Sequence, residues 1–473
     1  MSTIELIIDN ATVITMEGEG LGIIENGAVG VDGNRIVAVA QSEVVRRDYT
    51  AHRTIDASHK VVMPGLIDAH MHSGLGILRG IAQDTDNWME KGLWPFMQFL
   101  TPEQRKAGSL VNIIEGLKAG TTTFGDYDSG MNTIVQNHIA LGTRAHVCDM
   151  INEMPERMSD SRQVGDLYPL DPTVGEKKLQ DNLTLIENYH GSENGRITCL
   201  FGPQGPDMMS KELLLEVQNL AKKFDTPIHM HVAQGDREID QMVKRHGKRS
   251  IPYLEEIGYL DERLMAVHLT EATPEEAKTV ARSGAAMLLC SGSIGIIDGI
   301  VPPAAEFLET SNRLALGSDQ APGNNCNNMF NEMKFTSILN KCRNGDPRAF
   351  PAWQMLKSVT INAAQAIGLG EDIGSLKPGK KADVIILDLD SPAMFPTIQA
   401  PIRNIVPNLV YSANGSEVET VIIDGQVVVD EKIVQTVDEQ QAVVDGQEHA
   451  NDLASQVRGV DTPLTKMMTD GLL

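Results

Sequence analysis

The chain has 473 residues, of which 41% are hydrophobic and 22% are charged, and its formal net charge is −24. Nucleic acid and anionic membranes repel so acidic a protein, so we expect neither as a partner and favour a small-molecule substrate. The N-terminus lacks the basic start and long apolar run of a signal peptide, and no run approaches the roughly 20 apolar residues of a membrane span. The five cysteines are scattered, without a CxxC pair. We therefore expect a cytoplasmic protein.

Short alternating strands are predicted at both ends of the chain. Residues 1–62 contain runs such as IELIIDNATVITM and GAVGVDGNRIVAVA. The same alternating strand pattern occurs again in KADVIILDLD and VETVIIDGQVVVDEKIV. Two distant segments of one type predict a small β-sandwich domain built from residues 1–62 and 373–435. Residues 436–473 form a C-terminal tail, in which EQQAVVDGQEHANDLASQVRG predicts an amphipathic helix that is solvated or part of an interface.

Residues 63–372 alternate between helix and strand patterns. TPEQRKAGSLVNIIEGLKAG opens with a capping box from Thr101 to Gln104 and leads to the strand TTTFGDYD. A second box, from Thr273 to Glu276, opens TPEEAKTVARSG before the strand AAMLLCSGS. Repeated helix–Gly–strand units predict an α/β fold with a parallel sheet, and a (β/α)8 (TIM) barrel fits best. A doubly wound open sheet is the alternative, but the chain has no GxGxxG or GxxxxGK[ST] phosphate loop.

The ends of the apolar strands carry histidines and one aspartate. VVMPGLIDAHMH ends at His70 and His72, TPIHMH at His231, RLMAVHL at His268 and RLALGSD at Asp319. In a TIM barrel the catalytic groups lie at the C-terminal ends of the strands, so we expect these side chains to meet.

His70 and His72 are two apart on a strand, so their side chains point to the same face and converge as a divalent metal requires. A histidine in a strand is, taken alone, more often a packing residue than a ligand. Four of them at strand ends favour a metal site, which a carboxylate completes. Such a metal lowers the pKa of a bound water to about 7.

Several motifs resemble the amidohydrolase superfamily in chain order: KVVMPGLIDAHMH, AGTTTF, HMHVA, LMAVHL, LALGSDQAPGNN and IGSLKPGKKADVIILDLD. The resemblance covers nearly the whole chain and is closest to the branch of s-triazine hydrolases and nucleobase-like deaminases. It implies a TIM barrel beside a β-sandwich made from both termini.

The resemblance also implies roles for single residues. The metal ligands would be His70, His72, His231 and Asp319. Asp319 would also be the general base, and His268 would polarise the attacked centre. Members with two metals use a lysine in the fourth strand; RITCLFGPQGPDMM has none, so we expect one divalent ion per chain, zinc first and cobalt, iron or manganese otherwise. His229 points to the same face as His231, one step deeper, and is expected to support the site.

Three departures from the deaminase branch fall in the expected substrate half of the site. The branch usually reads His-x-x-Glu at the fifth strand, where this chain has Gln234, a residue that cannot act as an acid. Gln204 stands where a substrate-facing His or Ser is usual, and CSGSIGIIDG offers Ser291 and Ser293 without the usual Asn.

These departures predict hydrolysis with a changed substrate. A cyclic amidine must be protonated on nitrogen before water adds, whereas an acyl compound already carries a polarisable C=O. Gln234 therefore favours cleavage of a carbonyl C–N or C–S bond in a urea, carbamate or thiocarbamate. The pattern is similar to that of phenylurea hydrolases and thiocarbamate (molinate) hydrolases. Two alternatives stay open: a deaminase or dechlorinase of an N-heterocycle (s-triazine, pterin or nucleobase-like) that uses another acid such as Glu238, and a non-catalytic binding protein.

The loop after the first two histidines holds two of the three tryptophans, Trp88 and Trp94. In a chain with only 4% aromatic residues, this concentration predicts an apolar wall or lid over the site, with Trp88 as a substrate contact; packing outside the barrel is the alternative. Asn324, Asn325 and Asn327 form either a substrate contact or a helix start. We expect a homo-oligomer.

Overall fold

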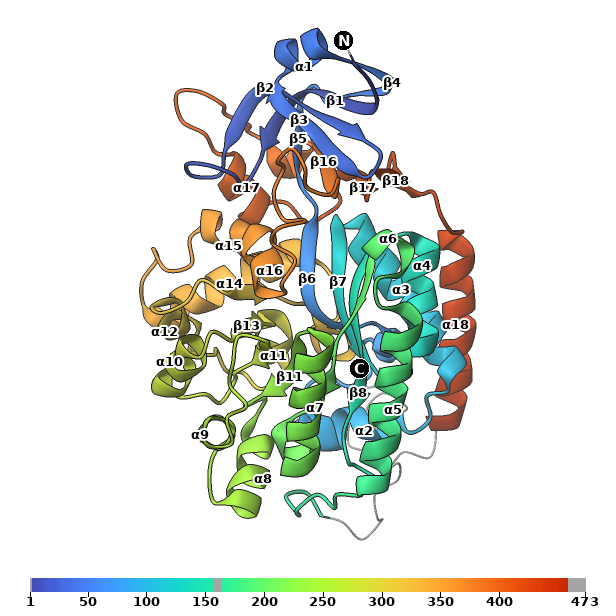
Figure 1. Cartoon of the computed structure of the whole chain (residues 1–473), viewed down its shortest axis with the longest axis vertical. Coiled ribbons are helices and arrows are strands. Elements are labelled where there is room, and N and C mark those ends of the chain that lie inside the picture. The colour runs from blue at the N-terminus through green and yellow to red at the C-terminus, as the bar shows by residue number, and fades with distance from the viewer. Residues whose placement is uncertain (1, 156–162, 458–473) are drawn as a thin grey trace.

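The computed structural model describes residues 2–155 and 163–457. A small β domain lies at one end of the molecule and a larger α/β domain at the other (Figure 1). The predicted tail beyond residue 457 lies outside the described residues. Within the part of the chain that the structure describes, no helix combines the length and the apolar character that a membrane crossing needs.

Both termini contribute strands to one nine-stranded sheet in the small domain. The strands are β1 (Ser2–Ile14), β2 (Ile23–Asp32), β3 (Arg35–Gln41), β4 (Tyr49–Asp56), β5 (Lys60–Pro64), β16 (Val384–Asp388), β17 (Val418–Ile423), β18 (Gln426–Asp430) and β19 (Ile433–Val434). The order is β19-β18-β17-β16-β5-β1-β2-β3, and β4 pairs with β1. The antiparallel pairing of β16 with β5 joins the two ends of the chain. The sequence predicted this joining; its boundaries at residues 62, 372 and 435 remain predictions.

The long strand β1 pairs with β2 along one edge and with two strands in succession along the other. Its first part pairs in parallel with β4, and its later residues Thr12 and Val13 pair in parallel with β5. Buried side chains from both ends of the chain, among them Ile8, Val384 and Ile422, form one apolar cluster beneath these strands. Burial of this shared cluster makes each terminus depend on the other for stability.

Parallel strands form the large domain, as the sequence predicted. They are β6 (Leu66–His72), β7 (Thr121–Asp128), β8 (Arg144–Ile151), β9 (Ile197–Cys199), β10 (Gly202–Pro203), β11 (Ile228–Val232), β12 (Leu264–His268), β13 (Ala286–Leu289), β14 (Leu314–Leu316) and β15 (Asp319–Gln320). One ladder has the order β10-β8-β7-β6-β15 with β9 also on β8, and the other has the order β11-β12-β13-β14.

Two further links connect the ladders into a ring, which confirms the α/β barrel fold class. A parallel bridge joins Phe201 to Ile228, between the fourth and fifth strand positions. The last strand continues from β14 into β15, which pairs in parallel with β6. Gly317 lies at this break, where a Cβ atom would come within 2.7 Å of the carbonyl oxygen of His70, so only glycine lets the eighth strand approach the first so closely.

Helices cover the outside of the barrel (Figure 1). They include α3 (Pro102–Lys118), α4 (Met131–Leu141), α5 (Pro172–Tyr189), α7 (Lys211–Phe224), α8 (Asp236–His246), α9 (Ser250–Glu256), α10 (Pro274–Arg282), α11 (Ser291–Ile297), α12 (Ala304–Leu308), α14 (Met329–Asn344), α15 (Ala352–Ser358) and α16 (Ile361–Ala366). Both predicted capping boxes are present, at the starts of α3 and α10.

The remaining elements are short connections and one terminal helix. They are α1 (Ser42–Asp48), η1 (Ser73–Leu78), η2 (Trp88–Leu93), α2 (Trp94–Met97), α6 (Ser192–Gly195), η3 (Pro206–Met208), α13 (Ala321–Asn324), η4 (Pro392–Met394), α17 (Ile405–Tyr411) and α18 (Glu439–Gln456). The terminal helix α18 lies along α3, where Glu439 forms an ion pair of 2.7 Å with Lys118. Its Leu453 is buried in an apolar cluster with Trp88 and Phe96.

Candidate active site

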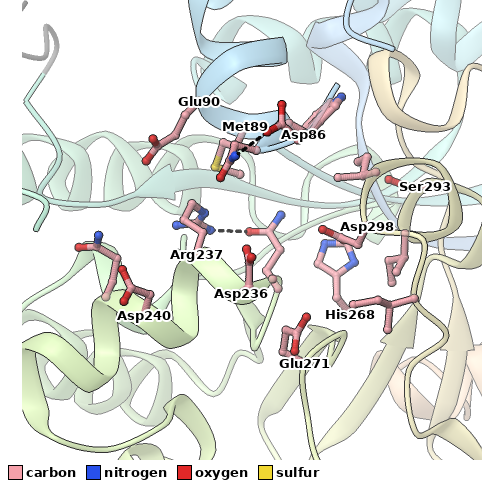
Figure 2. A pocket seen from close by; sticks show the side chains of 18 of the residues that line it. Asp86, Met89, Glu90, Asp236, Arg237, Asp240, His268, Glu271, Ser293 and Asp298 are labelled. Atoms are coloured by element: carbon pink, nitrogen blue, oxygen red, sulfur yellow. Dashed lines mark hydrogen bonds between the residues drawn. The ribbon is translucent and has the colours of Figure 1, made fainter. Parts of the chain in front are cut away.

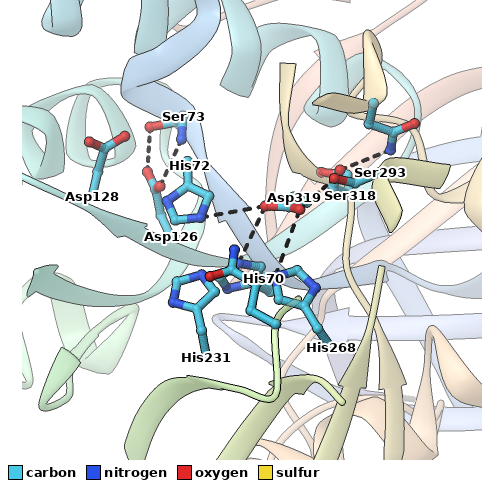
Figure 3. Close-up of polar contacts among 12 residues, drawn as sticks. His70, His72, Ser73, Asp126, Asp128, His231, His268, Ser293, Ser318 and Asp319 are labelled. Carbon is cyan, nitrogen blue, oxygen red and sulfur yellow. Dashed lines mark hydrogen bonds and ion pairs between the residues drawn. The ribbon is translucent and has the colours of Figure 1, made fainter. Parts of the chain in front are cut away.

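Five of the predicted residues meet at the C-terminal ends of the barrel strands (Figure 3). They are His70 and His72 on β6, His231 on β11, His268 at the end of β12 and Asp319 at the start of β15. All five are buried. His268 and Asp319 adopt positive φ angles of 76° and 63°, a backbone conformation that is costly for residues other than glycine and that clusters at functional sites.

The distances within this cluster fit a metal ion. Asp319 Oδ1 lies 3.4 Å from His72 Nε2 and 3.5 Å from His70 Nε2, and Asp319 Oδ2 lies 3.9 Å from His268 Nε2. Ligand atoms about 2.1 Å from a tetrahedral zinc are about 3.4 Å apart from one another. Two overlapping groups, His70–His231–His268 and His70–His72–Asp319, each place their ligand atoms within 4.8 Å of one another.

The protonation of the histidines also fits a metal. Burial, followed by the neighbouring imidazoles, holds the pKa of His70 and His231 well below the usual 6.5, and burial lowers the pKa of His268 to about 4. These rings are therefore neutral near pH 7. Among the residues that the structure describes, Nε2 of His70, Nε2 of His231 and both ring nitrogens of His268 have no hydrogen-bond partner. Buried nitrogens with free lone pairs are what a divalent ion needs.

The second nitrogen of each of two predicted ligands is held in place. His70 Nδ1 lies 2.8 Å from His229 Nε2, so the structure places His229 directly behind the ring of His70. His231 Nδ1 lies 2.8 Å from the main-chain oxygen of Gln204. Partners of this kind set the tautomer and the direction of a metal-binding imidazole.

A buried polar network holds the strand end that carries Asp319. Ser293 Oγ donates to Asp319 Oδ2 at 2.6 Å, and the backbone N–H of Ser318 donates to Asp68 at 2.9 Å. Asn324 links the carbonyl of Ser318 to the carboxyl group of Glu332, at 2.8 and 2.7 Å.

Sequence reasoning did not identify Asp68 or Glu332 in this network. Glu332 is the fourth residue of α14, where an acid ordinarily supports a helix start, so its sequence position carried no other signal. Burial raises its pKa to about 8, and burial likewise raises the pKa of Asp68 to about 7. Asn324 and Asn327, for which substrate contact was one possibility, bond instead to the chain at Ser318.

A cavity of about 610 Å³ opens onto Asp319 and His268. Of the predicted substrate contacts, Gln234, Trp88 and Ser293 line it. The structure does not bring Gln204 or Ser291 to this lining: the Gln204 side chain accepts from Asn152, and Ser291 bonds to Thr336. Carboxylates dominate the polar part of the lining, which includes Asp86, Glu90, Asp236, Asp240, Glu271 and Asp298 together with Arg237.

Gln234 faces this cavity and is oriented by Arg237. The guanidinium of Arg237 donates to Gln234 Oε1 at 3.4 Å, which Figure 2 shows as a dashed line. Arg237 also forms an ion pair with Asp207. The Gln234 amide thus belongs to a hydrogen-bonded polar cluster. It can donate and accept hydrogen bonds but cannot act as an acid.

Glu238, the alternative acid named from the sequence, has a different position. Its carboxylate accepts the backbone N–H groups of Ala233 and Gln234, at 2.7 and 2.9 Å. It is fully buried and does not line the cavity. In this structure Glu238 holds the turn after β11, and its oxygens face the chain rather than a substrate.

Comparison with known proteins assigns the family. A model of the amidohydrolase family matches residues 61–428. A 5-methylthioadenosine/S-adenosylhomocysteine deaminase of Thermoanaerobacter pseudethanolicus is 31% identical over 450 residues, which cover 95% of this chain and 99% of the relative. A 5′-deoxyadenosine deaminase of Methanosarcina barkeri is 31% identical over 463 residues, which cover 96% and 99%.

Solved structures agree with this assignment. An adenosine deaminase from Xanthomonas campestris with bound zinc superposes with a TM-score of 0.87 at 25% identity, covering 96% of this chain and 99% of that one. The atrazine chlorohydrolase of Arthrobacter aurescens complexed with zinc has a TM-score of 0.82 at 21% identity, covering 94% and 100%, which shows a shared fold. The alternative of a non-catalytic binding protein is therefore set aside. The chain belongs to the amidohydrolase family and is a metal-dependent hydrolase of carbon–nitrogen bonds.

Proposed function

We propose that the chain is a deaminase that replaces the amino group of an N-heterocycle, of the adenine-nucleoside type, by oxygen. The observation that carries this proposal is that the buried His/Asp cluster reaches, through His268 and Asp319, the wall of a cavity of about 610 Å³, within the size range of small-molecule sites. The relatives with 31% identity over nearly the whole chain act on such nucleosides according to their names. They favour this alternative over the urea, carbamate or thiocarbamate hydrolysis predicted first.

The proposed ligands of a single ion are His70, His72, His231 and Asp319, with zinc expected first and cobalt, iron or manganese as alternatives. The distances and unpartnered nitrogens described above support this set. When bound, the ion supplies an activated water nucleophile near neutral pH.

The side chains of the protein then move the protons. Asp319 takes a proton from the attacking water and passes it to the departing amine. Ser293 donates to Asp319 Oδ2 and so orients the carboxylate for this transfer. His268, which is neutral because burial lowers its pKa, presents an N–H to the oxygen that adds to the ring carbon and stabilises the negative charge on that oxygen.

Ammonia release from the metal-loaded protein tests this proposal. We expect turnover of 5′-deoxyadenosine, 5′-methylthioadenosine or S-adenosylhomocysteine, with loss of activity on chelation and recovery on adding zinc back. The His70→Asn variant should bind less metal and lose turnover. If the metal-loaded protein releases no ammonia from any aminopurine nucleoside or aminotriazine, the proposal is wrong.

Hydrolysis of a urea, carbamate or thiocarbamate is the second candidate, because Gln234 cannot donate a proton to a ring nitrogen. A substrate with its own C=O needs no such donor. Incubation with phenylureas and thiocarbamates, followed by detection of the released amine or thiol, separates the two functions. The similarity to phenylurea and molinate hydrolases noted from the sequence bears only on this second candidate. The homo-oligomeric state and the cytoplasmic location remain predictions.

A further inference from the structure

Deamination of an aminated ring needs an acid, which neither Gln234 nor Glu238 supplies. The electron pair of the C=N bond must move onto the ring nitrogen as water adds, so that nitrogen has to take up a proton. Gln234 is an amide, and both carboxylate oxygens of Glu238 accept backbone N–H groups. The donor must therefore come from another side chain of the cavity.

Asp298 occupies a suitable place in the cavity wall. It follows directly after α11, the helix that carries Ser293, and lines the cavity together with His268, Asp319 and Gln234. Its Oδ1 lies 3.6 Å from the position that a Cβ atom on Gly235 would occupy. The carboxyl group therefore faces the residue next to Gln234.

Three other acids of the lining are less available because they already have partners. Asp240 pairs with Lys244 at 2.6 Å, Asp86 pairs with Lys91 at 2.7 Å, and Glu90 accepts from Tyr168 at 3.0 Å. The carboxyl groups of Asp298, Asp236 and Glu271, in contrast, have no hydrogen bond or ion pair to any residue that the structure describes.

The surroundings of Asp298 favour its protonated form. As a whole residue Asp298 is exposed, but its carboxyl group lies within the cavity, where burial raises its pKa to about 7. The negative charges of Asp236, Glu271 and Asp319 raise the pKa further, and the positive charge of Arg237 opposes them. An acid with a pKa near the working pH is the most efficient proton donor.

We propose that Asp298 is the catalytic acid that protonates the ring nitrogen of the heterocycle, in place of an acid at Gln234; this assignment rests on the proposed deaminase function. Water oxygen bonds to the amine-bearing carbon while the ring nitrogen takes the proton of Asp298. The C–N bond to the amino group then breaks, and its electron pair leaves on ammonia, which carries the proton that Asp319 took from water. The last hydroxyl proton is released as C=O forms, and Asp298, at the exposed edge of the cavity, is reprotonated from solvent.

Three variants test the assignment in the metal-loaded, full-length protein. Asp298→Asn should lower kcat for ammonia release about 100-fold and remove the fall of kcat above about pH 7 that loss of the acid proton causes. In the double variant Asp298→Asn/Gln234→Glu, kcat should be at least about tenfold higher than in Asp298→Asn alone. The new carboxyl group stands next to Gly235, the residue that Asp298 faces. Glu271→Gln should move the alkaline limb of kcat to lower pH, because it removes a charge that holds the proton on Asp298.

The matched control is Asp225→Asn, which makes the same chemical change at a side chain that is 91% exposed before β11. It should leave kcat and the pH profile unchanged. If Asp298→Asn keeps kcat within about threefold and keeps the alkaline limb, the assignment is overturned while the deaminase function stands. If Asp298→Asn fails to fold, the shift or constancy of the limb in Glu271→Gln decides. If the wild-type protein releases no ammonia at all, both proposals fall together.

Discussion

The proposed metal side and the proposed substrate side of the active site are built from different parts of the fold. On the proposed metal side, His70, His72 and His231 lie within strands, and hydrogen-bonded neighbours fix the rings of His70 and His231. On the substrate side, Gln234 and Asp298 lie after the ends of a strand and a helix. Each barrel strand is hydrogen-bonded to its neighbours and cannot move alone, whereas the loops that follow the strands tolerate changes in sequence. The residues proposed to activate water are thus tied to the barrel strands, whereas the residues proposed to contact the substrate are not.

The largest expected effect comes from Asp319, where the two sides meet. Asp319→Asn keeps the shape of the side chain but removes the proposed base and weakens a proposed ligand, so kcat should fall about 10⁴-fold. Steady-state kinetics and metal content by elemental analysis measure the two losses separately. Activity within tenfold of the wild type would show that Asp319 is neither base nor ligand.

A smaller effect is expected for the residue behind the metal side. His229→Asn removes the ring nitrogen 2.8 Å from His70 Nδ1, and loss of such a partner typically costs 10–100-fold in metal affinity. Competition with a coloured chelator gives that affinity. His59→Asn is the matched control, because the His59 side chain is 77% exposed and lies in the small domain. Equal affinities in all three proteins would contradict a positioning role for His229.

On the substrate side, Gln234→Ala should reduce kcat/KM about fivefold and leave the metal content unchanged. A neutral hydrogen bond contributes roughly 1 kcal/mol, and Gln234 is expected to orient the substrate through such a bond. Substrate titrations at constant metal concentration measure this change. A loss of about 10³-fold would instead show that the chemical step depends on Gln234. The substrate side would then take part in the chemistry as well.

The smallest effect concerns stability. Burial raises the pKa of Glu332 to about 8, so the folded protein keeps a proton that the unfolded chain releases near pH 4.5. The stability due to this group is therefore present below about pH 4.5 and is lost as pH rises through about 8. In Glu332→Gln, the decrease in the free energy of unfolding between pH 5 and 8 should be smaller by at least about 1 kcal/mol. Urea unfolding of the metal-free protein at both pH values measures this free energy. If the free energy of unfolding changes equally with pH in the variant and in the wild type, Glu332 is ionised in the folded protein.

Local patterns in the sequence were sufficient for the barrel and for the meeting of the five strand-end residues. Apolar runs predict buried strands, and in a TIM barrel the ends of such strands share one face. No local pattern could place Gln204, whose carbonyl and not its side chain reaches His231, because that depends on the direction of the backbone at the break between β9 and β10. Asp298 and Glu332 were missed for a related reason: each becomes informative only when distant segments enclose it.

The strand that carries His70 and His72, the proposed metal pair, follows directly on a strand of the small domain. Lys60–Pro64 belongs to the small sheet, Leu66–His72 belongs to the barrel, and Gly65 alone separates them. A side chain at Gly65 would collide with Thr122, so the two strands continue along one closely packed path. The C-terminal strand β16 holds β5 by antiparallel pairing. The proposed metal pair is therefore anchored from outside the barrel, and we expect proteolytic loss of the last strands to loosen β6 and to weaken metal binding.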